Sequence, residues 1–436
     1  MKLLRPHLFA MLLAPLAAPI EANPLDTRFG TVIWGRNVTG QPHWIDGSVY
    51  DHVDAQSRLD HMVYVPLDPD GNPAATTSDP AKLRRGRYDC ALLDYWTDQA
   101  RQMASAGLDW VAIDSFGDRK DVEVADAVHD PKQDRYLVPS MVKGIRTAGV
   151  ALKICLLDDT PSHTLYDFRY EVLRGQFPGT SADGTPHWLK YRHDYQEVPV
   201  VPLAVSAAMG RRYLAQKWIN VYRLMAHARD LWLTHDGSHP DEGGRPVIFM
   251  YGANDEWMAK DTTGRWHEAF SSSKKAFAEA HGMEPFLIVD GMYLDFDPAV
   301  AQVADGTWFW APIAPKHIRE RKGVFTHASD GRVFVTGMVM PGFEQKHVTH
   351  AHTTERPRHI AIDGSVGDEK HLLATEFAIV MKDPRPNLVV IGHWNDFEEG
   401  QNFGLGIYPT KDGTRTLPPD YYLNAVRGLI RESRRR

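Results

Sequence analysis

Eight short apolar segments alternate with longer amphipathic stretches along this sequence, and that alternation limits the fold more than any other feature. The candidate strands cover residues 31–35, 108–114, 150–158, 246–251, 285–290, 306–310, 332–339 and 387–394. Between them, apolar residues recur every three or four positions, as at Val138, Val142 and Ile145, which is typical of helices packed on one face. Repeated strand–helix units predict a parallel sheet. Residues 388–391 are apolar throughout, as a strand buried on both faces requires.

The count of eight strands favours an α/β fold of the closed (β/α)8 TIM-barrel type over an open doubly wound sheet. No glycine-rich phosphate loop follows the first strand, which argues against a dinucleotide-binding fold. Two long insertions, residues 37–89 and 159–210, each follow a strand. We therefore expect both at the carboxyl-terminal face of the barrel, where such barrels keep their active sites.

Composition and the first residues indicate where the protein works. The chain has 436 residues, a formal net charge of −7 and 43% hydrophobic residues, which indicates a globular protein and argues against a nucleic-acid binder. Residues 1–22 resemble a signal peptide, because Lys2 and Arg5 precede an apolar run that is too short to anchor in a bilayer. An uncleaved lipid-surface tether and a mis-annotated start are the alternatives. Residues 23–436 then form one barrel domain, secreted or periplasmic.

No later segment reaches transmembrane length, so the mature chain is expected to be soluble. Its two cysteines are Cys90, at the start of a predicted helix, and Cys155, in the middle of a predicted strand. We favour two buried free thiols, with one disulfide as the alternative.

The densest group of chemically active side chains follows the eighth predicted strand. Residues 393–400 read His-Trp-Asn-Asp-Phe-Glu-Glu-Gly and contain three carboxylates within four residues. Crowded carboxylates resist simultaneous ionisation, so one can stay protonated as an acid while another acts as a base. Cleavage of a glycosidic bond needs that division of roles. Acids at this place in a chain can instead cap the next helix.

The stretch Trp394-Asn395-Asp396-Phe397-Glu398-Glu399-Gly400 resembles the signature that closes the barrel in glycoside hydrolase families 71 (α-1,3-glucanases) and 99 (endo-α-mannosidases), together with related uncharacterised bacterial families. Three other stretches are similar to the same families: residues 102–114, which run through an Ala-Gly-Leu-Asp turn into a strand ending in an acid, the Gly-Arg-Pro-Val strand at 244–251, and Met-Pro-Gly-Phe at 340–343. Together they cover most of residues 100–405.

The resemblance implies that the catalytic pair is Asp396 and Glu399, with Glu398 as a bystander. Family 99 has glutamate at the first position and histidine before the second acid, so this chain is closer to the family 71 pattern. Mannose specificity is therefore not implied. The short reach of Asp396 suits a general base for water in an inverting reaction, with Glu399 as the general acid. A retaining reaction is the alternative, and the separation of the two carboxylates decides between them.

Polar and aromatic side chains at other strand ends are candidates for substrate binding or, alternatively, for loop capping and core packing. They are Asp114, Asp158, Asn254, Glu256, Asp290, Tyr293, Trp308, Trp394, Asn395 and His347.

A rival site lies in the loop after the seventh strand, where His347, His350 and His352 have a spacing at which imidazoles can share a transition metal. The segment lacks a HExxH-type frame, and these histidines can equally be solvated or bind sugar.

The sequence thus predicts a glycoside hydrolase that acts as a monomer on an oligo- or polysaccharide and needs neither a cofactor nor a metal. Two alternatives stay open. One is a metal-dependent polysaccharide-modifying hydrolase that uses the histidine loop, and the other is a carbohydrate-binding barrel without turnover.

Overall fold

The computed structural model describes residues 27–34, 65–66, 93–115, 132–158, 207–236, 243–251, 266–290, 298–308, 334–343, 357–361, 363–382, 385–395, 400–408 and 410–436. Residues 1–22 and Cys90 lie outside these ranges, as does most of both predicted insertions, so the predictions made for them stay predictions. Cys155 is fully buried in its strand.

The eight predicted strands are all present and pair in parallel around a barrel. They are β1 (Arg28–Trp34), β3 (Trp110–Ser115), β4 (Lys153–Asp158), β6 (Arg245–Met250), β7 (Phe286–Asp290), β8 (Gly306–Trp308), the pair β9 (Phe334–Val335) and β10 (Gly337–Val339), and β11 (Leu388–His393). Their spatial order is β10-β11-β1-β3-β4-β6-β7-β8-β9. The predicted (β/α)8 fold is therefore confirmed.

The ring of paired strands closes through one segment of the chain, residues 334–339. Its first half, β9, pairs with β8, and its second half, β10, pairs with β11. Thr336 joins the two halves and donates its backbone N–H to the carbonyl oxygen of Thr307 at 2.8 Å. The two strands thus act as a single eighth strand with partners on both sides, and the barrel has no open edge there.

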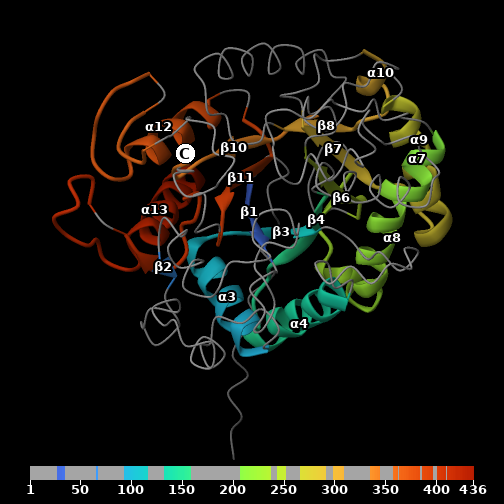
Figure 1. The fold of residues 1–436 in the computed structure, drawn as a ribbon, viewed down its shortest axis with the longest axis horizontal. Coiled ribbons are helices and arrows are strands. Elements are labelled where there is room, and N and C mark those ends of the chain that lie inside the picture. The colour runs from blue at the N-terminus through green and yellow to red at the C-terminus, as the bar shows by residue number, and fades with distance from the viewer. Residues whose placement is uncertain are drawn as a thin grey trace, which may run out of the picture.

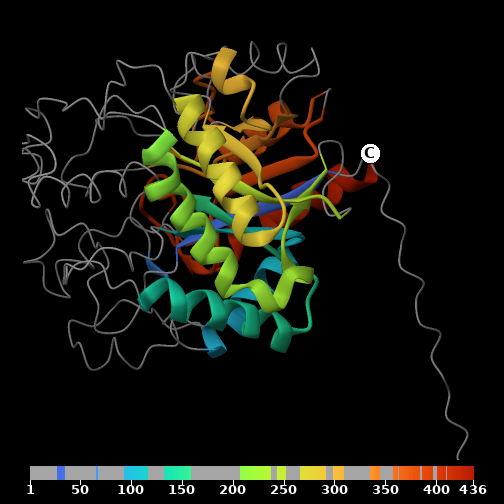
Figure 2. The ribbon, with the colours of Figure 1, turned by 90° about the vertical axis from the view of Figure 1, so that its right-hand side faces the viewer.

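Helices cover the outside of the barrel (Figure 1). The longer ones are α3 (Leu93–Ala106), α4 (Lys132–Ala148), α8 (Ala215–Leu224), α9 (Trp266–His281), α12 (His371–Val380) and α13 (Tyr421–Arg435). Shorter elements are α7 (Ala207–Met209), a π-helical turn (Gly210–Leu214), a 3₁₀ turn (Ala226–Leu231) and α10 (Pro298–Ala301). Figure 2 shows α4, α8 and α9 as a layer outside the strands. No helix in the described ranges is long and apolar enough to cross a membrane.

Within the part of the chain that the structure describes, three short strands lie off the barrel wall. The strand β5 (Thr234–His235) pairs antiparallel with the start of β6, and β2 (Val65–Pro66) pairs antiparallel with β12 (Gly406–Ile407).

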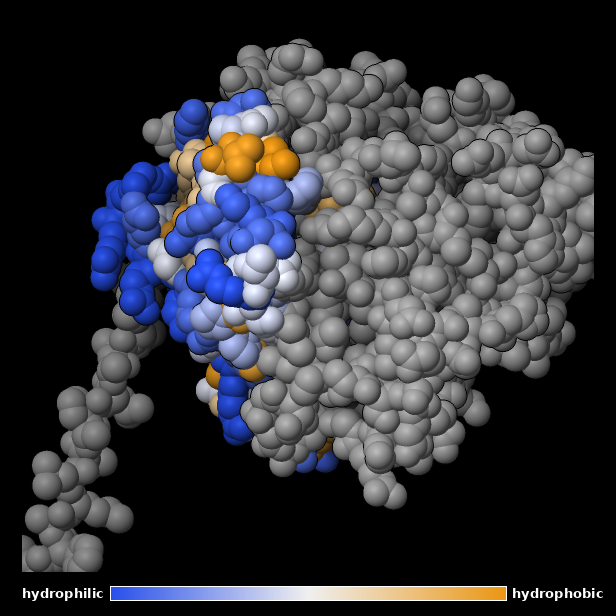
Figure 3. All heavy atoms as spheres, turned by 60° about the vertical axis from the view of Figure 1, so that its left-hand side comes forward, coloured by the Kyte–Doolittle hydropathy of each residue, from blue (hydrophilic) through white to orange (hydrophobic). Residues whose placement is uncertain are grey.

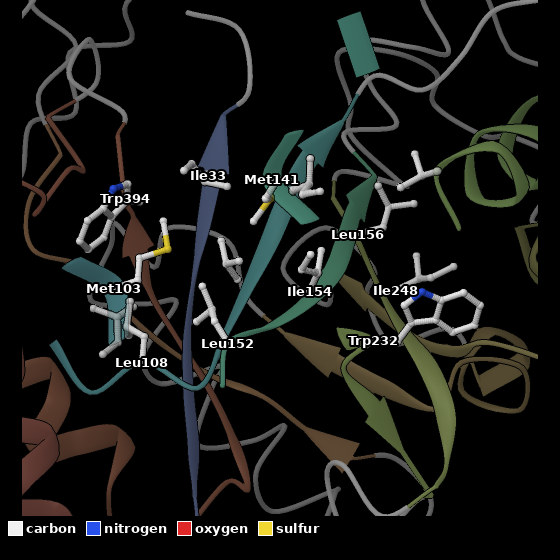
Figure 4. Packing of buried hydrophobic residues seen from close by; sticks show 14 of the residues in the cluster. Ile33, Met103, Leu108, Met141, Leu152, Ile154, Leu156, Trp232, Ile248 and Trp394 are labelled. Carbon is white, nitrogen blue, oxygen red and sulfur yellow. The ribbon is translucent and has the colours of Figure 1, made fainter. Parts of the chain in front are cut away.

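Alternation along each strand separates two apolar cores. Residues such as Ile33, Ile154 and Ile248 face the helices and pack with Met103, Trp232 and others (Figure 4). The opposite faces fill the barrel interior, where the rings of Trp110 and Phe249 stack with centroids 5.3 Å apart. Filling the interior with side chains is what makes a parallel barrel a packed core rather than a pore.

Asp109 links the last helix, α13, to the amino-terminal end of the barrel. Both of its carboxylate oxygens accept from Arg434 Nη2 of α13 at 2.7 Å, and one also accepts from the backbone N–H of Phe29 at 2.9 Å. Burial raises the pKa of Asp109, and the arginine and the N–H oppose that rise.

Figure 3 shows a mainly hydrophilic surface over the described elements on the side of α12 and α13.

The fold generates a prediction on pH. His281, the last residue of α9, is buried against α8, and its Nε2 lies 3.1 Å from the carbonyl oxygen of Ile219. Burial lowers the pKa of His281 because it disfavours the imidazolium. Below the ordinary histidine pKa of about 6.5, the unfolded chain therefore binds a proton that the folded chain resists, and stability falls as the pH falls. His281→Gln keeps an N–H donor for Ile219 without titrating.

We expect the unfolding free energy of the wild type to fall more than that of His281→Gln between about pH 7.5 and about pH 5.5, as measured by urea unfolding at both pH values. Equal losses in the two proteins would contradict the assignment.

Candidate active site at the carboxyl-terminal mouth of the barrel

Polar side chains replace apolar ones at the last interior position of several strands. Asp114 continues the inward face of Trp110 and Ala112 on β3, and Asp290 continues that of Phe286 and Ile288 on β7. Asp290 pairs in register with Trp308, so both belong to the same layer of the barrel. Asp114 is 6% exposed and Asp290 is fully buried. This end of the barrel is the one that we expected to carry the site.

A bulge in β11 brings a histidine into that layer. Val390 pairs with Gly30, but Val32 pairs with His393, so β11 holds one more residue than β1 over this stretch. The extra residue is accommodated at Gly392, whose φ is 40°. Thr31 on β1 donates its hydroxyl to the carbonyl oxygen of Ile391 at 2.7 Å. Because the alternation shifts at the bulge, His393 shares the inward face of Val32.

His393 and Asp114 form a buried pair across β1. The Nε2 of His393 lies 3.7 Å from Oδ2 of Asp114, and the two side chains are 0% and 5% exposed. A carboxylate beside an imidazole orients the ring. Together they offer hydrogen-bond acceptors and a donor to a polyhydroxylated ligand.

Asp158 faces the opposite way from Asp114. Its Oδ2 accepts from the indole N–H of Trp218 at 2.7 Å, and its Oδ1 lies 3.3 Å from Lys217 Nζ, both on α8. The strand alternation turns Leu157 inward and Asp158 outward, toward the helix layer. We therefore expect Asp158 to anchor α8 and not to contact substrate, which revises the role expected for it from its position at a strand end.

The two aromatic candidates are also buried. Trp394 follows the bulge and faces outward, where it packs near Met103 of α3 (Figure 4). Its indole N–H donates to Oε1 of Gln99. Trp308 lies in the barrel interior, and its indole donates to the carbonyl oxygen of Met250 at 2.9 Å. Both rings therefore contribute to the core. Asn395, next to Trp394, is buried at the mouth with 2% exposure.

Other candidate residues lie outside the described ranges: Asp396, Glu399, Asn254, Glu256, Tyr293 and His347, together with His350 and His352. Within those ranges, no three histidines, cysteines or acids are grouped so that they could hold a metal ion.

Sequence reasoning did not assign roles to His393 or Arg358. His393 belongs to the quoted motif, but regular alternation would have turned it outward, and only the bulge at Gly392 brings it in. Arg358 lies two residues after Arg356 in a polar stretch and carries no pattern that would single it out. It is 3% exposed and donates from Nη2 to the carbonyl oxygens of Gly400 and Asn402 at 2.8 and 2.6 Å.

Comparison with known proteins gives a family and a fold. A family model described as "Domain of unknown function (DUF5010)" matches residues 89–433. No curated protein matches the sequence. Among solved structures, the GH99 endo-alpha-mannosidase from Bacteroides thetaiotaomicron is similar at a TM-score of 0.52 and 12% identity, over 94% of this chain and 98% of that one. A "Glycoside hydrolase-like protein" is similar at a TM-score of 0.53 and 13% identity, over 95% and 97%. At this level of identity, both similarities show the fold alone.

The bulge can be tested with an alanine at Gly392. A Cβ there would lie 2.6 Å from Cδ of Pro341 in addition to requiring a positive φ. Gly413 is a matched control, because its φ is 67° and a Cβ would meet nothing within 4 Å. We expect Gly413→Ala to cost about 1 kcal/mol for the backbone conformation alone, and Gly392→Ala to cost about 1–3 kcal/mol more for the overpacking. Denaturant unfolding measures both, and equal costs would count against the close approach.

The buried pair of Asp158 and Lys217 can be tested by a double-mutant cycle. Lys217→Met leaves a buried carboxylate without its cation, and we expect it to cost about 3–5 kcal/mol of unfolding free energy. Asp158→Asn combined with Lys217→Met removes both charges and keeps an acceptor for Trp218. The double variant should therefore be more stable than Lys217→Met alone. A double variant that is equally or less stable would show that the ion pair is not the interaction lost.

Proposed function

The chain belongs to the family described as a domain of unknown function (DUF5010), and we propose that it is a glycoside hydrolase whose carboxylate pair, Asp396 and Glu399, cleaves glycosidic bonds in an oligo- or polysaccharide. The proposal is supported by the fold, by the polar interior of the barrel mouth and by the place of the acidic segment in the chain. The named activity of the GH99 endo-alpha-mannosidase belongs to that protein, and we extend from it only the class of reaction.

The observation that carries the proposal is the anchoring of the chain on both sides of the acids. On one side, the backbone N–H of Trp394 donates to the carbonyl oxygen of Val32 at 2.7 Å and Asn395 is buried. On the other, Gly400 is buried and bound by Arg358. Four residues, which include all three acids, separate these two anchors in the chain, and one residue spans at most about 3.6 Å.

The roles follow from the chemistry of glycoside hydrolysis. Glu399 protonates the oxygen of the leaving sugar as general acid, and Asp396 activates water as general base, which gives inversion at the anomeric carbon. Asp114, Asp290, His393 and Asn395 accept and donate hydrogen bonds to sugar hydroxyls at the floor of the site. None of these steps needs a metal or a cofactor. The expected signal peptide at residues 1–22 would bring this activity to the periplasm or outside the cell.

The test is the release of reducing sugar from a panel of α- and β-linked glucans and mannans. The proteins compared are the wild type, Asp396→Asn and Glu399→Gln, with Glu398→Gln as a matched control in the same segment. We expect kcat to fall by about 10²- to 10⁴-fold in the first two variants, because each loses one proton-transfer group, and to stay within about threefold in Glu398→Gln. A chelator should change nothing.

Activity that survives both catalytic substitutions would contradict the assignment of the pair. Activity that a chelator abolishes would favour a metal-dependent hydrolase using His347, His350 and His352. Binding of a polysaccharide without any release of sugar would favour a binding barrel.

A further inference from the structure

We propose that Arg358 is the positioning residue of the active site, holding the backbone that directly follows the acidic segment. The inference rests on the proposed function, because it assigns Arg358 a role in placing Glu399. It is carried by described contacts of Arg358 with Gly400, Asn402 and two tyrosines.

Arg358 is itself fixed by its surroundings before it reaches the acidic segment. Its carbonyl oxygen accepts from the backbone N–H of Leu372 in the first turn of α12 at 2.9 Å. Its guanidinium carbon lies 4.0 Å from the ring centroid of Tyr422 on α13 and 5.1 Å from that of Tyr408. Both tyrosines are buried, and their ring centroids are 4.8 Å apart. The guanidinium therefore packs against two buried aromatic rings.

Arg358 also binds the chain just after the acids. Its Nη2 donates to the carbonyl oxygens of Gly400 and Asn402 at 2.8 and 2.6 Å, and lies 3.3 Å from Oδ1 of Asn402. Asn402 in turn donates from Nδ2 to the hydroxyl of Tyr408 at 2.7 Å. Two carbonyl oxygens that point at one guanidinium fix the orientation of the peptide units between them.

Pro341 and Gly342, which follow β10, leave room for this contact. A Cβ on Gly342 would lie 2.5 Å from Cγ of Arg358 and 3.3 Å from the carbonyl oxygen of Gly400. The residue before Gly342 is Pro341. A Cβ on Gly392 would lie 2.6 Å from Cδ of Pro341 and 3.0 Å from the carbonyl oxygen of Gln401. Thus Pro341 and Gly342 pack against both ends of the segment 392–401, which contains all three acids.

The consequence concerns the separation of the two carboxylates. Glu399 directly precedes Gly400 in the chain, so we infer that a fixed Gly400 carbonyl limits how far the backbone of Glu399 can move. The separation between acid and base decides whether a water molecule fits between the base and the sugar. A displacement of about 1 Å is enough to reduce a rate about 100-fold. We therefore assign Arg358 a positioning role that acts through Glu399.

The experiment compares Arg358→Met, which keeps an unbranched apolar stem, and Arg358→Lys, which keeps the charge but not the planar fork, in the full-length chain. Arg427→Met is the matched control. It removes an arginine from α13 that donates to the backbone carbonyl oxygen of Ser105 at 2.6 Å, away from the mouth. Steady-state kinetics and the pH profile of kcat are measured on the polysaccharide that the wild type cleaves, below the melting temperature of every variant.

We expect Arg358→Met to lower kcat by about 10- to 100-fold with KM nearly unchanged, and to shift the limb of the pH profile that reports the general acid. Arg358→Lys should recover part of kcat, and Arg427→Met should leave both kcat and the profile as in the wild type. Gly342→Ala, which pushes Arg358 aside without changing any charge, should lower kcat in the same way and serves if Arg358→Met does not fold.

Wild-type kcat and an unshifted pH profile in Arg358→Met, or in Gly342→Ala if Arg358→Met does not fold, would overturn the inference and leave Arg358 a structural residue. That outcome is distinct from failure of the proposed function. The proposed function fails if the wild type releases no sugar, or if Glu399→Gln stays active, whereas the inference fails if activity needs Glu399 but is indifferent to Arg358.

Discussion

Closure of the barrel by residues 334–339 is the constraint on which the rest of the structure depends. A parallel barrel has all its strand ends of one kind at one mouth, so closing the sheet at Thr336 brings Asp114, Asp290 and His393 to the same end from three different strands. An open sheet of the same strands would spread these residues along an edge. Closure also buries each strand on both faces, which explains why residues 388–391 carry no polar side chain.

Burying polar groups so close to an apolar interior has a cost that specific partners offset. The carboxylate of Asp158 is paired with Lys217 and hydrogen-bonded by Trp218, so it lies in the helix layer without being left unsatisfied. The guanidinium of Arg358 is placed over two buried aromatic rings, an arrangement that contributes about 2 kcal/mol when both partners are desolvated. These two groups stabilise elements next to the mouth, whereas Asp114, Asp290 and His393 line the mouth itself.

The local chain geometry around β11 connects this scaffold to the proposed chemistry. The bulge at Gly392 uses one extra residue to turn His393 inward and Trp394 outward. Thr31, Pro341 and Arg358 then hold the chain before and after the acids, through contacts that come from β1, from the end of β10 and from the loop before α12. Rigid support of this kind is what proton transfer requires, because its rate depends steeply on the placement of the acid and the base. The acidic motif and the polar floor would then act as one site.

The sequence by itself determined the class of fold and the end of the barrel at which function is expected. Strand alternation and apolar runs are local signals, so all eight strands were predictable, and a polar residue ending an apolar strand marked Asp114 and Asp290. Tertiary structure alone decided which way the other candidates face. Asp158 turns toward the helices by the regular alternation of β4. Trp394 does so because the extra residue in β11 moves the following side chains to the other face of the sheet. Arg358 meets Gly400 across 42 residues of sequence, and Asp109 meets Arg434 across 325, contacts that exist only once the barrel has closed.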